Sequence, residues 1–117
     1  MNTINIANDF SKFPGPRYRE EGDNSGEEFR ERILRPRFEA ARKTGEKLII
    51  ELDGVAFGYP TSFLEESFGG LARDCGIDTV LDVLVFRSSD ERLLPKEIER
   101  YIRNAEKTSQ ERAAAKQ

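Results

Sequence analysis

The segment Lys47–Ala72, KLIIELDGVAFGYPTSFLEESFGGLA, constrains the fold more than any other part of the chain. Its β-branched and apolar start, Leu48–Leu52, predicts a strand. A loop containing glycine and proline follows, and the spacing of Ser62 and Glu65 is that of a capping box, which predicts that a helix begins at Ser62. Because open α/β sheets place their working sites at the carboxyl ends of strands, this strand–helix junction is the main candidate for a functional site.

Two further strands are expected, one on each side of this segment. Ile4–Ala7 alternates apolar and polar residues, and Thr79–Phe86 is a nearly continuous apolar run, which is typical of a strand buried on both faces. Helical patterns separate the strands, and Pro95 suits the first turn of a last helix. Strands that alternate with helices predict an α/β domain with a mostly parallel sheet. We assign residues 1–106 to this single domain and residues 107–117 to a flexible C-terminal tail.

Capping residues, prolines and glycines mark where the helices begin, end or are disturbed. Ser25 and Glu28 form another capping box, and Gly45 ends the helix that begins there. Pro36 removes a hydrogen-bond donor in mid-helix, so we expect a kink or a second helix start. The pair Gly69-Gly70 lies inside the following helix at a cost of about 1 kcal/mol per glycine relative to alanine. That cost predicts a close approach of this helix to another backbone.

The composition argues against several classes of function. The net charge is −3 and the pI is about 5.2, with basic and acidic residues interleaved, which argues against a nucleic-acid partner. No apolar run is long enough to cross a membrane, and the first residues lack the pattern of an export signal, so we expect a cytoplasmic protein that binds no membrane. The chain has one cysteine and no histidine. Cys75 lies on the apolar face of a predicted helix and is expected to be a buried, unreactive thiol.

Four carboxylates, those of Glu51, Asp53, Glu65 and Glu66, are expected near the junction. Converging carboxylates can hold Mg²⁺, which makes a metal-dependent hydrolase an alternative function. Structural roles account for three of the same residues, because Glu65 belongs to the capping box, Glu66 suits the positive end of the helix dipole, and Asp53 precedes the glycine of a turn. Phosphate-binding glycine loops are absent from the sequence. We therefore expect no catalytic residue, no bound metal and no cofactor.

The hydroxyl groups at the junction allow two interpretations. Thr61 and Ser62 either cap the helix or are regulatory phosphorylation sites, because a phosphate at a helix N-terminus gains from the dipole and from unpaired backbone amides. Glu65 and Glu66 lie within one turn and would repel such a phosphate. The same junction could hold a nucleotide or an anion, which suggests a third function, that of a sensor for a small ligand or nucleotide, although the acidic first turn argues against an anion there.

Three aromatic residues flank the loop and are either core residues or an exposed patch for a partner. They are Phe57, Tyr59 and Phe63. Tyr59 lies between Gly58 and Pro60 and is expected to be the most exposed of the three.

The runs LIIELDGVAFGYPTSFLEESFGGLAR and SGEEFRERILRPRFEAA carry a family resemblance that covers roughly residues 4–102. The chain resembles the bacterial STAS-like domains of unknown function, small relatives of the sulfate-transporter and anti-sigma-factor-antagonist domain. The resemblance implies a small STAS-like α/β domain, with a mixed, mostly parallel sheet and helices mainly on one face.

The resemblance also implies a partner. Anti-sigma-factor antagonists bind an ATPase-type serine kinase of the histidine-kinase superfamily, which phosphorylates a serine at the start of the helix after the central strand. Thr61 or Ser62 occupies that place here, and Tyr59-Pro60 stands where the regulated antagonists carry Asp-Ser. We therefore expect a non-enzymatic regulatory module that docks on a histidine-kinase-type ATPase or anti-sigma-like protein through residues 54–66. The residues expected to contact the partner are Asp53, Gly54, Gly58, Tyr59, Pro60, Phe63, Glu65 and Glu66.

Overall fold

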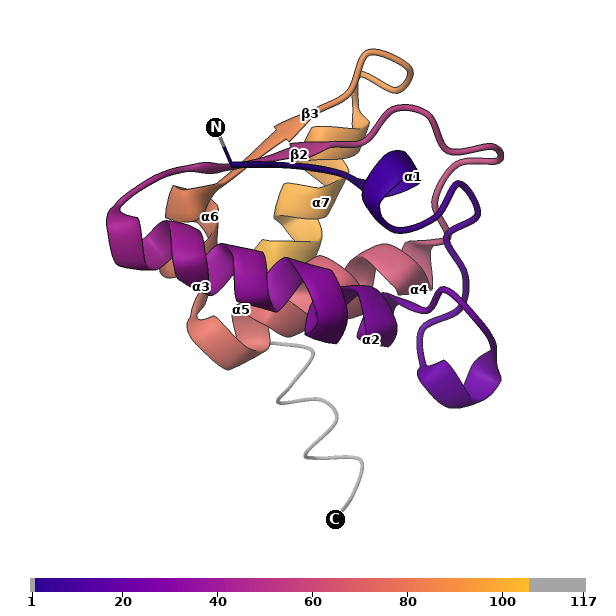
Figure 1. Ribbon diagram of the computed structural model, residues 1–117, viewed down its shortest axis with the longest axis horizontal. Coiled ribbons are helices and arrows are strands. Elements are labelled where there is room, and N and C mark those ends of the chain that lie inside the picture. The colour runs from indigo at the N-terminus through magenta and orange to yellow at the C-terminus, as the bar shows by residue number, and fades with distance from the viewer. Residues whose placement is uncertain (1, 106–117) are drawn as a thin grey trace.

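Three parallel strands form a sheet in which the strands lie in chain order (Figure 1). The strands are β1 (Thr3–Asn5), β2 (Leu48–Glu51) and β3 (Leu84–Arg87). Ile50 at the centre is paired with Ile4 on one side and Phe86 on the other. The computed structural model describes residues 2–105, and the tail expected at residues 107–117 lies outside this range.

Most of the helices lie on one side of the sheet (Figure 1). Successive side chains of a strand point to opposite faces, so each strand has an inner and an outer set. Ile4 and Ile50 belong to the inner set and have no exposed surface. Val85 belongs to the outer set and keeps 37% of its surface exposed. The expected α/β fold, with helices mainly on one face of a parallel sheet, is therefore confirmed.

A long first helix with a widened turn packs under the sheet. It consists of α2 (Gly26–Phe29), the π-helical segment η2 (Arg30–Leu34) and α3 (Arg35–Thr44). The Ser25 hydroxyl accepts a hydrogen bond from the Glu28 amide at 3.0 Å, which confirms the expected cap, but the Glu28 carboxylate pairs with Arg32 instead of reaching back. The widened turn lies just before Pro36, where an irregularity was expected, and Gly45 ends the helix in the left-handed region.

A second long helix follows β2 and also contains a widened turn. It consists of α4 (Thr61–Leu64), the π-helical segment η3 (Glu65–Gly69) and α5 (Gly70–Cys75), and ends at Gly76 as expected. The capping box predicted for Ser62 and Glu65 is wrong. Pro60 occupies the N-cap position, so Ser62 is the second residue inside the helix and makes no capping hydrogen bond. The Glu65 carboxylate instead accepts a hydrogen bond from Arg17 at 2.7 Å.

Both outer strands are shorter than predicted because helices replace part of them. The run predicted as a strand over Thr79–Phe86 is mostly α6 (Ile77–Val83), and only its last residues enter β3. The apolar residues Ile77, Val80 and Leu81 of α6 have the spacing of one helical face, which a continuous apolar run conceals. At the N-terminus, the Asn5 side chain accepts a hydrogen bond from Asn8 and caps α1 (Ile6–Asp9), so the predicted strand Ile4–Ala7 ends early.

Two further elements complete the described chain: the short 3₁₀ helix η1 (Arg19–Glu21) and the last helix α7 (Leu94–Arg103). Pro95 lies in the first turn of α7, as predicted. The buried residues on and just after this helix are Leu94, Ile98, Ile102 and Ala105.

Aromatic rings connect the two long helices to the sheet through the core. The ring of Phe29 lies 5.8 Å from that of Phe63 and 6.1 Å from that of Phe68, and Phe68 meets Phe86 of β3 edge-on at 5.1 Å. Phe29, Phe63 and Phe68 have no exposed surface. Aromatic pairs in such stacked or edge-on geometry contribute about 0.5–1.5 kcal/mol each beyond their burial. The start of the second helix is therefore fixed by its packing in the core.

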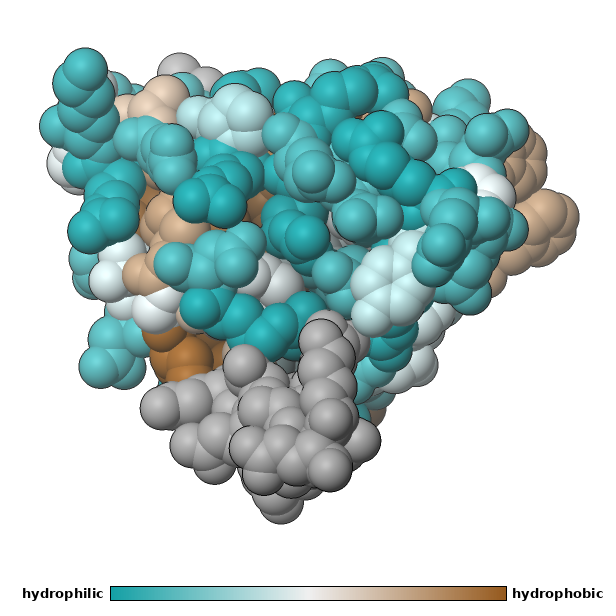
Figure 2. Space-filling model, turned by 90° about the horizontal axis from the view of Figure 1, so that it is seen from below, coloured by the Kyte–Doolittle hydropathy of each residue, from teal (hydrophilic) through white to brown (hydrophobic). Residues whose placement is uncertain are grey.

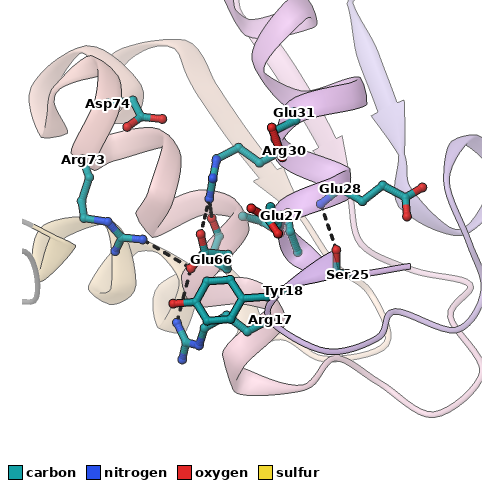
Figure 3. A network of polar contacts seen from close by, with 12 residues as sticks. Arg17, Tyr18, Ser25, Glu27, Glu28, Arg30, Glu31, Glu66, Arg73 and Asp74 are labelled. Atoms are coloured by element: carbon teal, nitrogen blue, oxygen red, sulfur yellow. Dashed lines mark hydrogen bonds and ion pairs between the residues drawn. The ribbon is translucent and has the colours of Figure 1, made fainter. Parts of the chain in front are cut away.

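A buried carboxylate joins the same two helices (Figure 3). Glu66 is only 4% exposed, and Arg30 donates both to its carboxylate Oε2 and to its backbone carbonyl, each at 2.6 Å. Its other oxygen, Oε1, lies 3.5 Å from Arg73 and 3.7 Å from Arg17. Three guanidinium groups from a loop and two helices thus surround one carboxylate.

The glycine pair of the second helix makes room for this cluster. A Cβ atom at Gly70 would collide with the guanidinium group of Arg30, and one at Gly69 would lie 3.5 Å from the carbonyl oxygen of Tyr101 in α7. The predicted close approach to another backbone is therefore wrong for Gly70, where the close neighbour is an arginine side chain, and at Gly69 the backbone of α7 lies at an ordinary contact distance. Arg30 begins one π-helical segment and Glu66 lies in the other, so the two widened turns face each other across this pair.

We predict that Glu66→Gln destabilises the fold far more than Glu65→Gln. Removing the buried negative charge leaves Arg30 and Arg73, whose side chains are about 15% and 14% exposed, without their counter-charge. Breaking a buried ion pair in this way costs about 3–5 kcal/mol. The Glu65 side chain is 38% exposed, and losing its pair with Arg17 should cost less than about 1 kcal/mol. Urea unfolding of both variants measures the two losses, and equal losses would contradict this account.

Candidate functional site

The carboxyl end of β2 meets the carboxyl end of β3 in two adjacent loops. The Leu52 amide donates to the Arg87 carbonyl at 2.9 Å, which extends the strand pairing by one residue. The Asp53 carboxylate then reaches the β3–α7 loop, where it accepts from the amides of Ser89 and Asp90 at 3.0 Å and from the Ser88 hydroxyl at 3.2 Å. These hydrogen bonds, from Asp90 and then Ser89, lower the pKa of Asp53 below its ordinary value of 3.8. Asp53 therefore ties the loops together as an ionised carboxylate.

Tyr59 anchors the loop that follows β2. Its hydroxyl donates to the Leu52 carbonyl at 2.7 Å, and its ring lies 6.0 Å from that of Phe63. Burial raises the pKa of the Tyr59 hydroxyl, so it stays protonated as a donor. The prediction that Tyr59 is the most exposed aromatic residue is wrong, because Phe57 is 91% exposed and Tyr59 is half-buried.

Phe57 forms an exposed aromatic pair with a residue far away in the sequence. The rings of Phe57 and Phe13 lie 6.1 Å apart at 38°, and Phe13 is 59% exposed. The Ala56 amide donates to the Lys12 carbonyl at 2.8 Å, which holds the two backbone segments together beside the rings. Seen from below, the described surface is mostly hydrophilic, and its hydrophobic areas are few (Figure 2). Two adjacent exposed phenylalanines are therefore an unusual feature of this surface.

A cavity of about 220 Å³ lies between the two loops. Leu52, Tyr59 and Leu94 supply apolar walls, and Asp90 and Glu91 supply carboxylates. Its acidic lining disfavours a nucleotide phosphate, because like charges repel in a confined space. The sensor function considered from the sequence therefore finds no phosphate-binding geometry at this cavity.

The four carboxylates considered as a metal site do not come together. Glu51 is paired with Arg87 at 3.8 Å, Glu65 with Arg17, and Glu66 is enclosed by arginines. Asp53 faces the β3–α7 loop. Across residues 2–105, no three Asp, Glu or Cys side chains are close enough to share a metal ion. The carboxylate cluster that the alternative of a metal-dependent hydrolase requires is thus not assembled in the described part of the chain.

The structure separates the residues predicted to contact a partner into accessible and inaccessible ones. Phe63 is fully buried and Glu66 is 4% exposed, so neither side chain can touch a docked protein in this conformation. Gly54 and Pro60 are exposed, and Gly54 adopts a φ of 101°, which only glycine accepts easily. The accessible part of the predicted surface is accordingly the loop from residue 54 to residue 61 together with Glu65, whose side chain is 38% exposed. Phe13 was not predicted to lie at this surface, and Phe57 was predicted only as one of three aromatic residues that flank the loop.

The hydroxyls of Thr61 and Ser62 are at the start of the second helix, as predicted, and neither caps it. Thr61 is exposed and Ser62 is half-buried. Cys75, expected to be buried, is half-buried, and burial raises the pKa of its thiol. None of the helices within residues 2–105 combines the length and the apolar character that a membrane crossing requires.

We predict that Asp53→Asn lowers the melting temperature at neutral pH and that the difference from the natural protein closes in acid. The folded-state pKa of Asp53 is depressed, so its carboxylate stabilises the fold above pH 3.8, and this contribution disappears as the pH falls through the folded-state pKa. Thermal unfolding of both proteins from neutral pH to below pH 3.8 tests this. A difference that stays constant over the whole range would contradict it.

Comparison with known proteins places the chain in a family. A family model described as a STAS-like domain of unknown function matches residues 25–93, which is more than half of the chain. Comparisons with curated proteins and with solved structures find no significant match. The matched region spans both long helices, β2, α6 and β3, which together form the framework of the junction. The chain belongs to the family of STAS-like domains of unknown function.

Proposed function

We propose that this domain is a non-enzymatic regulatory module that docks on an ATPase or serine-kinase-like protein of the histidine-kinase type. The observation that carries the proposal is the exposed Phe13–Phe57 pair at the carboxyl end of the sheet. Exposed aromatic residues next to one another are typical of the central part of a protein–protein interface. Membership of a STAS-like family supports the class of partner, because the chain resembles the anti-sigma-factor antagonists, which bind such kinases.

The proposed docking surface consists of residues 54–61 together with Phe13. Two fixed points hold its loop: Tyr59 donates to the Leu52 carbonyl, and the Ala56 amide donates to Lys12. A loop that is already held in one conformation loses little entropy when a partner binds, which favours affinity. Phe63 and Glu66 were expected from the sequence to touch the partner. Both are buried, and they contribute by fixing the position of the helix that follows this loop.

The absence of histidine supports a role without catalysis. The carboxylates near the junction support it too, because each of the four has a structural partner and they do not converge. General acid–base catalysis requires a titratable group directed at a substrate.

Phosphorylation would act on Thr61 within this proposal. Thr61 is exposed at the first position of the second helix and is not used as a cap, whereas Ser62 is half-buried. A phosphate there would be close to the first backbone amides of the helix and to the loop that contains Phe57. It would also add negative charge near Glu65, and this would weaken docking by an acidic partner surface.

We predict that Phe57→Ala weakens binding of the ATPase partner by about tenfold or more, the effect of truncating a central interface residue. The variant should fold normally, because Phe57 is 91% exposed. Affinity capture from the native host with the full chain as bait, followed by titration of the captured ATPase, measures the change. The matched control is Leu93→Ala, which removes another exposed apolar side chain, 68% exposed, outside residues 54–61. If the Phe57 variant binds the ATPase with unchanged affinity, the proposed docking surface is wrong.

We predict further that the captured ATPase, supplied with MgATP, adds one phosphate to this chain at Thr61. Tandem mass spectrometry locates the modification, and Thr61→Val should abolish it while Ser62→Ala leaves it in place. If the ATPase binds this chain but adds no phosphate to it, the proposed docking function stands and the proposed phosphorylation is wrong.

A further inference from the structure

An arginine-rich pocket is lined by residues of η3, α5 and α7 and by Arg17 from the loop before the first long helix. Its volume is about 150 Å³. Arg17, Arg73 and Arg100 line it, and within residues 2–105 Glu65 supplies the only carboxylate of the lining. The whole chain is acidic, with a net charge of −3, so such a concentration of guanidinium groups in one cavity is contrary to the general charge of the protein.

The described residues that line this pocket carry more guanidinium groups than carboxylates, namely those of Arg17, Arg73 and Arg100 against that of Glu65. The buried carboxylate of Glu66 lies among Arg17, Arg30 and Arg73, and Arg17 also binds Glu65. Arg100 has no carboxylate within ion-pair distance among residues 2–105, and its guanidinium group lies 5.6 Å from the centre of the Tyr101 ring. The C-terminal end of α7 contributes about half a negative charge, which reduces the positive character of this lining.

Two of the lining arginines are held in place before any ligand arrives. The side chains of Arg17 and Arg73 are 24% and 14% exposed, and the buried carboxylate of Glu66 lies between them (Figure 3). Guanidinium groups that are fixed in this way lose little freedom on binding an anion. Glu66 thus positions two arginines at the pocket as well as joining the helices. Gly69 lines the pocket without a side chain, which keeps the wall beside η3 open.

The pocket is large enough for a phosphate group. Its volume is about 150 Å³, whereas one water molecule needs only about 10–15 Å³ of such space. Guanidinium groups bind phosphate oxygens through charge-assisted hydrogen bonds, often two at a time. Tyr101 and Asn104 add polar groups to the lining.

We propose that this pocket is a binding site for a phosphate group, presented either as free inorganic phosphate or as a small phosphomonoester. The site is separate from the docking surface formed by residues 54–61 and Phe13, and shares no residue with it. A STAS-like domain of this kind would carry two sites, one for a protein and one for a small anion.

The experiment is a titration of the full chain with potassium phosphate, followed by amide NMR, with potassium chloride at equal ionic strength as the reference. We expect saturable shifts at Gly69, Arg73 and Tyr101 that chloride does not produce. Phenyl phosphate, titrated in the same way, distinguishes the two sources, because tighter binding than inorganic phosphate indicates a phosphomonoester and weaker binding indicates the free ion.

The decisive variant is Arg100→Gln, because Arg100 is exposed and lies outside the buried cluster, so its loss leaves the fold intact. Losing one charge-assisted hydrogen bond should weaken phosphate binding by about tenfold or more. Arg42→Gln is the matched control, since Arg42 is an exposed arginine in the last turn of α3 and does not line the pocket. Shifts that do not saturate, or an equal loss in the Arg42 variant, would overturn the proposal.

Discussion

The carboxylate of Glu66 is the interaction on which the arrangement of the helices depends. It is almost completely buried, and it receives Arg30 from the first long helix, Arg73 from its own helix and Arg17 from the loop before them. A buried ion pair adds little net stability compared with an apolar replacement, but it strongly penalises every arrangement in which one partner is left alone. Its effect is therefore to select one packing of the two long helices. The widened turns and Gly70 are the local adjustments that allow this packing.

The same constraint determines what the candidate site can offer to a partner. Because Glu66 and Phe63 point into the protein, they fix the start of the second helix in the core, while the loop before it, Thr61 and part of Glu65 remain accessible. Asp53 and Tyr59 fix the loop from its other end by hydrogen bonds to the β3–α7 loop and to Leu52. The exposed Phe57 thus projects from a rigid support, although it lies in a loop. Rigid presentation of a few apolar side chains is a property that docking modules share.

Local features of the sequence predicted local structure well, whereas contacts between distant residues could not be inferred from it. Ser25 caps its helix as expected because the bond joins neighbouring residues, and the same rule failed at Ser62 because Pro60 starts the helix earlier. Val80 and Val83 were assigned to a strand because a buried helix and a buried strand are both apolar. The pairing of Phe13 with Phe57 and the enclosure of Glu66 join segments far apart in the chain, and no spacing rule connects such residues. The α/β class was predictable because it depends only on the alternation of elements.

The chain order of the strands has a consequence for how the protein can form. Since β1, β2 and β3 are neighbours in the order of synthesis, no strand has to enter between two that are already paired. Residues 2–75 already include two strands, both long helices and all members of the Glu66 cluster. A nascent chain that has been synthesised as far as residue 75 therefore already contains the Glu66 cluster, which selects the packing of the two long helices. Growth of the sheet at one edge, by α6, β3 and α7, can then follow translation without undoing any earlier contact.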